Sequence, residues 1–141
     1  MTVPREYAAA SRDFENFLIA ARDSLGCETT HRAYAAVRAV LLVFRRRLSA
    51  SDAVRFAGAL PPLLRALFVD DWNMDEAVLP FGDRASLTRD VQAIRIDHNV
   101  APGDAIAAVA RAIAHHVDRG RFERVLATLS DAAQAYWNIE V

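Results

Sequence analysis

Lysine is absent from the sequence, and cysteine occurs once, at Cys27. A single cysteine excludes an internal disulfide and leaves no group of thiols to bind zinc or an iron–sulfur cluster, which is typical of the reducing cytoplasm. Long apolar runs are also missing, because even residues 39–44 fall far short of the roughly 20 residues that cross a bilayer. Arg5 and Glu6 stand where a signal peptide needs an apolar segment. We therefore expect a cytoplasmic protein without a membrane partner.

The overall charge is close to neutral, since 17 arginines face 18 acidic residues and the net charge is -1. This balance exerts no general attraction on nucleic acid or on an anionic membrane. The length of 141 residues suits one domain with one core. We expect a single domain over residues 1–141.

Apolar residues recur at spacings of three and four along most of the chain, which is the pattern of amphipathic helices. Gly26 and Pro61 are expected to end two of these helices, and Ser51 or Asp52 to cap the helix before Pro61. The side chains expected to form the core are Phe14, Phe17, Leu18, Val37, Val40, Phe44, Phe56, Leu60, Leu87, Val91, Ile94, Val109, Ile113, Val117, Phe122, Val125 and Leu129.

The order of these features repeats. A shift of 73 residues lays AVRAV at 36–40 over VARAI at 109–113, and a shift of 69 after a shorter loop lays 67–68 over 136–137. In the second copy, Pro102 is expected in the first turn of the middle helix, with Asp104 near its start. The sequence thus predicts an all-α helical bundle of two tandem three-helix repeats, each closed by a short fourth helical turn. The repeats cover residues 11–69 and 84–138, with an acidic connector at 70–83.

Three stretches resemble a known family, the bacterial domain of unknown function 2267. They are GALPPLLRALFVDDW at 58–72, the F..FL pattern at 14–18 and AYW at 135–137. The resemblance implies an all-helical fold with two related halves, no established activity and no catalytic residues to carry over. The family often has Leu-Pro at the end of the third helix in both halves, whereas the second half here reads Leu129-Ser130. The last helix is therefore expected either to continue or to turn differently at this point.

His115 and His116 are adjacent at the end of an apolar helix. Neighbouring helical residues point about 100° apart, so two of them do not grip one ion, and Arg111 and Arg119 lie one turn from His115 on either side. In the repeat they occupy the positions of Leu42 and Val43. We expect an exposed His115, a His116 at the boundary of the core, and no metal site.

The outer face of the helix around residue 42 is the first candidate for a functional surface. Leu42 lies between Arg38 and Arg45 on the side turned away from the expected core, where a large apolar residue needs cover. We expect this face to pack against the other half of the chain or against a second subunit in a homodimer. The candidate interface residues are Leu41, Leu42, Val43 and Trp72.

An arginine-rich segment is the second candidate for a functional surface, because positions 29–69 contain seven arginines and only one acidic residue. They could bind an anion or nucleic acid if folding leaves a continuous basic face. Arginines are also favoured in the last turn of a helix, and the acidic connector that follows could neutralise them. The candidate anion-binding residues are Arg38, Arg45, Arg46, Arg47 and Arg55.

Catalytic signatures are not found. The sequence has no glycine-rich phosphate loop, nucleophile elbow or HExxH motif, and Cys27 with His31 lacks an evident orienting carboxylate. We therefore favour a non-catalytic protein-interaction or self-association module without a cofactor, with a protein partner or a second copy of the chain as its partner. A regulatory domain that binds an anion or nucleic acid through the arginines is the alternative.

Overall fold

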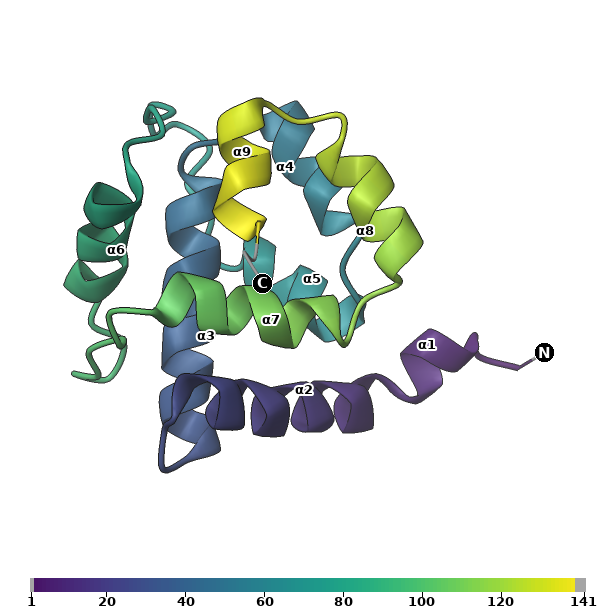
Figure 1. The fold of residues 1–141 in the computed structure, drawn as a ribbon. Coiled ribbons are helices and arrows are strands. Elements are labelled where there is room, and N and C mark those ends of the chain that lie inside the picture. Colours follow the sequence, from purple (N-terminus) through teal and green to yellow (C-terminus); the bar gives the residue numbers. More distant parts are fainter. Residues whose placement is uncertain (1, 139–141) are drawn as a thin grey trace.

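The computed structural model describes residues 2–138, so residue 1 and residues 139–141 of the expected domain lie outside the description. Within the described residues every regular element is a helix, which confirms the all-α fold class (Figure 1). None of these helices has both the length and the apolarity that a membrane span requires. The helices are α1 (Arg5–Ala8), α2 (Ala10–Leu25), α3 (Thr30–Arg45), α4 (Ala50–Ala57), α5 (Pro62–Val69), α6 (Arg84–Ala93), α7 (Ala105–Ala114), α8 (Arg119–Leu126) and α9 (Asp131–Trp137).

Local sequence explains where several helices begin and end. Gly26 ends α2 in the left-handed conformation, at φ 70°, which glycine adopts without steric cost. The N-cap of α4 is Ser49, whose hydroxyl accepts a hydrogen bond from the amide of Asp52 at 3.1 Å. The expected cap at Ser51 or Asp52 is therefore wrong, because the extended backbone at Ser49 already places an oxygen over the first turn.

The second middle helix also begins later than expected. Pro102 precedes α7, and its carbonyl accepts from the amide of Ala105 at 3.1 Å in a turn. The side chain of Gln92 holds the carbonyl of Ala101 at 3.3 Å, so this segment is tied to α6 rather than wound into the helix. Asp104 is the residue before α7 and makes no capping hydrogen bond with its side chain.

The helices of the two halves of the chain interlock. Helix α2 packs along both α3 and α7, α3 also packs on α6, and α4 lies beside α8 (Figure 1). Polar contacts cross the same boundary, since the hydroxyl of Ser24 donates to the carbonyl of Ala108 at 2.8 Å and Tyr136 donates to the carbonyl of Val40 at 2.6 Å. Both halves therefore contribute to one core.

Aromatic rings form the centre of this core. The ring of Phe44 lies 4.7 Å from Phe56, 4.9 Å from Tyr136 and 5.1 Å from Trp137, measured between centroids. Each fully buried ring of this size stabilises the fold by about 2 kcal/mol. Most of the expected core residues are buried, but five are only half-buried because they stand at helix edges or ends: Phe14, Leu18, Ile94, Val117 and Val125.

Candidate functional site

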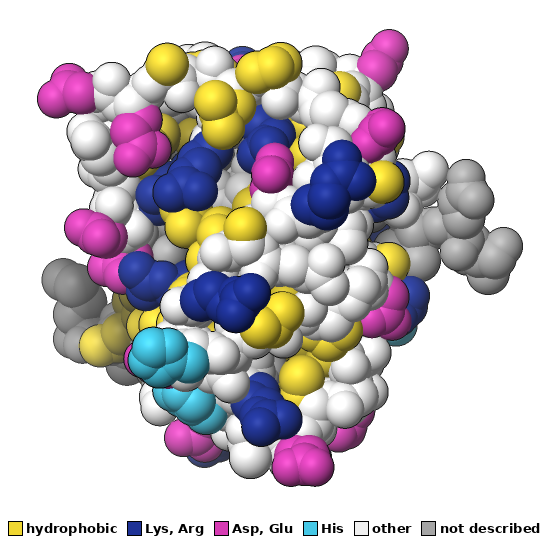
Figure 2. All heavy atoms as spheres, turned by 90° about the vertical axis from the view of Figure 1, so that its left-hand side faces the viewer, with side chains coloured by type: hydrophobic (Ala, Val, Ile, Leu, Met, Phe, Trp, Pro, Cys, Tyr) yellow, Lys and Arg dark blue, Asp and Glu magenta, His cyan; other side chains and the backbone are white. Residues whose placement is uncertain are grey.

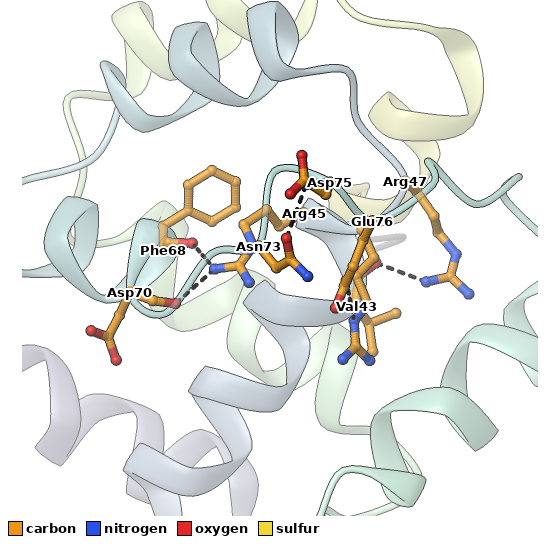
Figure 3. Close-up of polar contacts among 9 residues, drawn as sticks. Val43, Arg45, Arg47, Phe68, Asp70, Asn73, Asp75 and Glu76 are labelled. Atoms are coloured by element: carbon orange, nitrogen blue, oxygen red, sulfur yellow. Dashed lines mark hydrogen bonds and ion pairs between the residues drawn. The ribbon is translucent and has the colours of Figure 1, made fainter.

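The arginines at the end of α3 hold the segment that follows α5. Arg45 is only 5% exposed, and its Nη1 donates to the carbonyls of Phe68 at 3.0 Å and Asp70 at 2.9 Å (Figure 3). These carbonyls end α5, where no helical amide is available to them. The guanidinium also lies 5.5 Å from the centroid of the Trp72 ring. Burial lowers the pKa of Arg45, and the neighbouring Arg46 adds to this effect, yet arginine stays charged at neutral pH.

Carboxylates of the acidic connector (residues 70–83) pair with two further arginines. Arg38 contacts Asp70 at 2.8 Å, and the side chain of Arg46 lies 3.9 Å from Glu76. The carbonyl of Arg46 also accepts from the amide of Leu79 at 2.9 Å. The connector is thus fastened along the last turns of α3.

Arg47 and Arg55 have partners elsewhere. Arg47 is buried, donates to the carbonyl of Val43 at 2.8 Å and pairs with Asp90 of α6 at 2.5 Å (Figure 3 shows the Val43 contact). Arg55 pairs with Asp52 within α4.

The arginine cluster therefore does not form the continuous basic face that anion binding requires. Each of the five candidate arginines contacts a carboxylate or backbone carbonyl of the same chain. On the α6 side of the molecule, Figure 2 shows basic side chains in separate groups with hydrophobic and acidic side chains between them. The acidic connector neutralises part of the local excess through Asp70 and Glu76.

The candidate interface around Leu42 needs a correction. Leu41 and Val43 are each 1% exposed, so neither offers a surface to a partner. Helix α3 is contacted by α2, α5, α6 and α7, and its supposed outer face is therefore largely enclosed. Leu42 is half-buried beside a hollow of about 150 Å³ that it shares with Leu67 of α5 and Asp71 of the connector. Trp72, also half-buried, lies over Arg45.

The two histidines lie where the sequence places them. His115 is exposed and His116 is half-buried, which confirms both expectations. The Nδ1 atom of His116 is 2.9 Å from the carbonyl oxygen of Ala112, and its ring meets Phe17 edge to face at 5.7 Å. Among the described residues, no group of three or more histidine, cysteine or acidic side chains is arranged to hold a metal ion.

Cys27 and His31 do not form an activated pair. Burial raises the pKa of the Cys27 thiol, which keeps it protonated and weakens it as a nucleophile. His31 instead contacts Asp97, with Nε2 3.1 Å from a carboxylate oxygen. The acidic pairs at 70–71 and 75–76 are exposed on the connector.

Helix α5 carries a surface that the sequence reasoning missed. Leu64 and Phe68 point into the core, while Leu63, Ala66 and Val69 are exposed at spacings of three, with Leu63 and Val69 each 38% exposed. A helix that is apolar on all sides is normally buried on all sides. The α5 sequence PLLRALFV is apolar apart from Arg65, so this rule could have indicated from the sequence that the outer side of α5 needs cover.

The only charged residue of α5 does not face outward from this stripe. Arg65 turns back to the end of α4, where it donates to the carbonyls of Ala57 at 3.2 Å and Leu60 at 3.0 Å. Its Nη1 also lies 3.4 Å from the hydroxyl of Tyr7, so the side chains of α1 and α5 meet at this point. The exposed side of α5 is therefore uncharged.

A hollow of about 390 Å³ adjoins this stripe, between α2, the start of α5 and the end of α7. Phe14, Leu63 and Val117 are among its apolar lining residues, and Asp13 and His115 also line it. Beside it, α1 extends away from the bundle (Figure 1). We call Tyr7, Phe14, Leu63, Ala66 and Val69, with this hollow, the α5 face.

Comparison with known proteins identifies the family. The model of a family described as "Uncharacterized conserved protein (DUF2267)" matches residues 14–136, which run from α2 to α9 and leave α1 outside the match. No curated protein matches the chain. Because the family match spans most of the sequence and nearly all of the described helices, the chain belongs to the DUF2267 family.

Proposed function

We propose that this protein is a non-catalytic self-association module, and that the α5 face binds the same face of a second copy of the chain. The observation that carries the proposal is the exposed, uncharged stripe of Leu63, Ala66 and Val69. Covering such a stripe removes apolar surface from water without the cost of desolvating a charge, because Arg65 is already turned toward α4.

The proposal includes a repeat relationship between the halves. The order α2 to α5 corresponds to α6 to α9, and the short helices support this correspondence in detail. Helices α4 and α8 begin 69 residues apart and end 69 residues apart, and their capping residues Ser49 and Asp118 have the same separation. Helices α5 and α9 begin at Pro62 and Asp131, again 69 residues apart.

This correspondence supplies an internal comparison for the α5 face. The three exposed positions of α5 correspond to Ala132, Ala135 and Asn138 at α9, which are exposed as well. The second half therefore keeps small or polar side chains where the first half has Leu63 and Val69. Since the corresponding helix folds without these large apolar side chains, a contact outside the chain would explain why the first half has them.

The shape of the α5 face favours a second copy as the partner. An interface with two-fold symmetry needs a surface that is complementary to itself. Here Tyr7 of α1 is exposed and contacts Arg65 of α5, the helix whose first residues line the hollow of about 390 Å³, so each copy offers both a projection and a recess. Two copies related by a two-fold axis can each fill the recess of the other.

The test is the oligomeric state of the full chain, measured by light scattering coupled to size exclusion and by sedimentation velocity over a concentration series. The informative variant is Leu63→Ala with Val69→Asn, because it installs the residues found at the corresponding exposed positions of the second half. We expect a dimer for the unmodified chain and at least about a tenfold higher dimer dissociation constant for the variant. Both proteins should have the same circular dichroism spectrum.

The matched control is Val54→Asn, which removes an exposed valine of α4 outside the α5 face. It should leave the dimer dissociation constant unchanged. A chain that stays monomeric at every concentration refutes the proposal. Equal dimer affinity in the double variant and the unmodified chain refutes the assignment to the α5 face.

A further inference from the structure

The acidic connector carries a second group of exposed apolar side chains. Met74 is 60% exposed, Val78 56% and Leu79 44%. Met74 and Val78 border the same shallow hollow of about 50 Å³, so these two side chains lie close together. Single exposed apolar residues are ordinary, but several together on one segment mark a contact surface. We call Met74, Val78 and Leu79, with Asp71 and Asp75, the connector surface.

Hydrogen bonds hold this surface in one conformation. The amide of Leu79 donates to the carbonyl of Arg46 at 2.9 Å, which fixes the apolar end of the segment on α3. The amide of Asp75 donates to the side-chain oxygen of Asn73 at 3.0 Å, and the amide of Glu76 donates to the carbonyl of Asn73 at 3.3 Å (Figure 3). Because folding already orders these residues, binding a partner requires little further ordering of the connector.

The charge that remains at the connector surface is negative. Asp71 and Asp75 are exposed, and neither forms an ion pair within residues 2–138. Arg46, which also borders the hollow, faces Glu76 at 3.9 Å, and Arg45 is buried. The exposed carboxylates therefore outnumber the exposed cations around these apolar side chains.

This combination of apolar and acidic groups distinguishes between kinds of partner. Negative charge repels the phosphates of nucleic acids and the headgroups of anionic lipids. A small cation would neutralise the carboxylates but leave the apolar side chains in water. A protein segment with apolar side chains between basic residues covers the apolar part and complements the carboxylates.

We propose that the connector surface binds a short segment of a partner protein in which arginines or lysines flank apolar side chains. The apolar side chains pack on Met74, Val78 and Leu79, and the basic residues meet Asp71 and Asp75. In Figure 1 the connector lies above α6, at the opposite end of the molecule from α1 and α2, and Figure 2 shows hydrophobic and acidic side chains together at that end. The site shares no residue with the α5 face and does not rest on self-association.

Three dye-labelled peptides of equal length are the probes, and fluorescence anisotropy measures their binding to the full chain. The first peptide has leucines flanked by arginines, the second has the same leucines flanked by glutamates, and the third has serines in place of the leucines. We expect the first peptide to bind saturably, and the other two to bind at least about tenfold more weakly. Added salt should weaken binding of the first peptide, because dissolved ions screen exposed charges.

Two double variants and a control locate the site. Met74→Ser with Val78→Ser removes apolar side chains from exposed positions and should raise the dissociation constant of the first peptide at least about tenfold. Asp71→Asn with Asp75→Asn should raise it about fivefold and nearly abolish its salt dependence. Asparagine also tolerates the left-handed backbone of Asp71, at φ 53°. The control, Val100→Ser, changes an exposed valine between α6 and α7 and should leave the constant unchanged.

The α5-face variant, Leu63→Ala with Val69→Asn, separates this proposal from self-association. It should bind the first peptide as tightly as the unmodified chain does, and a loss of binding there would place the peptide on the α5 face and overturn the proposal. Absence of saturable binding by the first peptide also overturns it, as does equal affinity for the arginine-flanked and glutamate-flanked peptides. Unchanged affinity in the folded Met74→Ser, Val78→Ser variant would rule out the connector surface as the site.

Discussion

Pro61 and Ser130 have the same backbone conformation at the start of the last helix of each half. Their φ and ψ angles are -65° and 162° for Pro61 and -62° and 160° for Ser130. The family resemblance led us to expect a continued helix or a different turn at Ser130, where proline is frequent, but the turn is the same. Proline reaches this φ through its ring, whereas Ser130 holds it with a side-chain oxygen that accepts from the amide of Ala133 at 3.2 Å.

Substitutions at Ser130 should therefore distinguish the effect of the side-chain cap from the effect of a proline ring on stability. Ser130→Ala loses the cap and should lower the free energy of unfolding by about 1 kcal/mol. Ser130→Pro also loses the cap, but the proline ring reduces the conformational entropy of the unfolded chain. This effect should raise the free energy of unfolding by about 0.4–1 kcal/mol and so offset part of the loss. We expect the proline variant to be the more stable of the two in urea denaturation. A proline variant clearly less stable than the alanine variant would show that the two turns are not equivalent.

Arg45 should be among the most sensitive polar positions. Arg45→Met keeps the length of the side chain but leaves the carbonyls of Phe68 and Asp70 without their donor and removes the group beneath Trp72. We expect a loss of about 3 kcal/mol in the free energy of unfolding. The emission of Trp72 should shift to longer wavelength as the connector loosens, measured in a Trp137→Phe background.

Arg46→Met is the matched control for Arg45. Its side chain is exposed and lies 3.9 Å from Glu76, so its loss should lower the free energy of unfolding by no more than about 0.5 kcal/mol. Equal effects of the two substitutions would contradict a capping role for Arg45.

The ion pair of Arg47 with Asp90 and that of Arg38 with Asp70 should differ in strength. Asp90→Asn leaves the buried guanidinium of Arg47 without its carboxylate, and we expect a loss of about 2 kcal/mol. Asp70→Asn affects Arg38, which is more exposed and also contacts Tyr34, and should cost about 0.5 kcal/mol. The contribution of Asp70 should also fall more steeply with salt, because dissolved ions screen an exposed pair more effectively than a buried one. Urea denaturation of both variants at low and high salt measures the two losses and their salt dependence. A larger loss for Asp70→Asn than for Asp90→Asn would contradict the prediction that the Arg47 pair is the stronger one.

Tyr136 should make the fold sensitive to alkaline pH. Burial raises the pKa of its hydroxyl well above the ordinary value, and the nearby Arg47 and Arg84 offset only part of this. The hydroxyl therefore keeps its proton in the folded chain, while an unfolded tyrosine ionises near pH 10. Stability from this group is complete below that pH and falls by up to about 1.4 kcal/mol per pH unit above it.

Tyr136→Phe provides the comparison. It loses the hydrogen bond to Val40 and should be about 1 kcal/mol less stable at neutral pH. Its free energy of unfolding should then decline less steeply than that of the unmodified chain between pH 10 and 12. Parallel declines in the two proteins would rule out Tyr136 as the source.

Much of the helical pattern could be read from local signals. Gly26 and Pro61 mark real helix boundaries, because their backbone restrictions act whatever surrounds them. Residue 49 was missed as a cap because Ser49, Ser51 and Asp52 all carry capping oxygens, and only the backbone conformation selects among them. Pro102 likewise suits a helix start by composition but lies in a turn held by Gln92.

The surfaces were harder to predict, since a helix has a solvent side only if neighbouring helices leave one. Leu41 and Val43 were grouped with Leu42 as candidate interface residues, yet several helices surround α3 and both side chains are buried. Leu63 belongs to the short closing turn that the sequence predicts, and the structure leaves both Leu63 and Val69 exposed on a full helix. The exposed and boundary positions of His115 and His116 were predicted correctly, because α7 has one clear apolar side.

The sequence by itself determined the helical class, the helix boundaries at Gly26 and Pro61, the family and the identity of most core residues, because these depend on spacing and on the conformational limits of single residues. Tertiary structure alone decided which charges meet and which apolar side chains stay uncovered. The arginines of α3 became clamps for the connector only because folding brings Asp70 and the end of α5 beside them. The exposed stripe of α5 arises for the same reason, since it depends on which helices lie next to it.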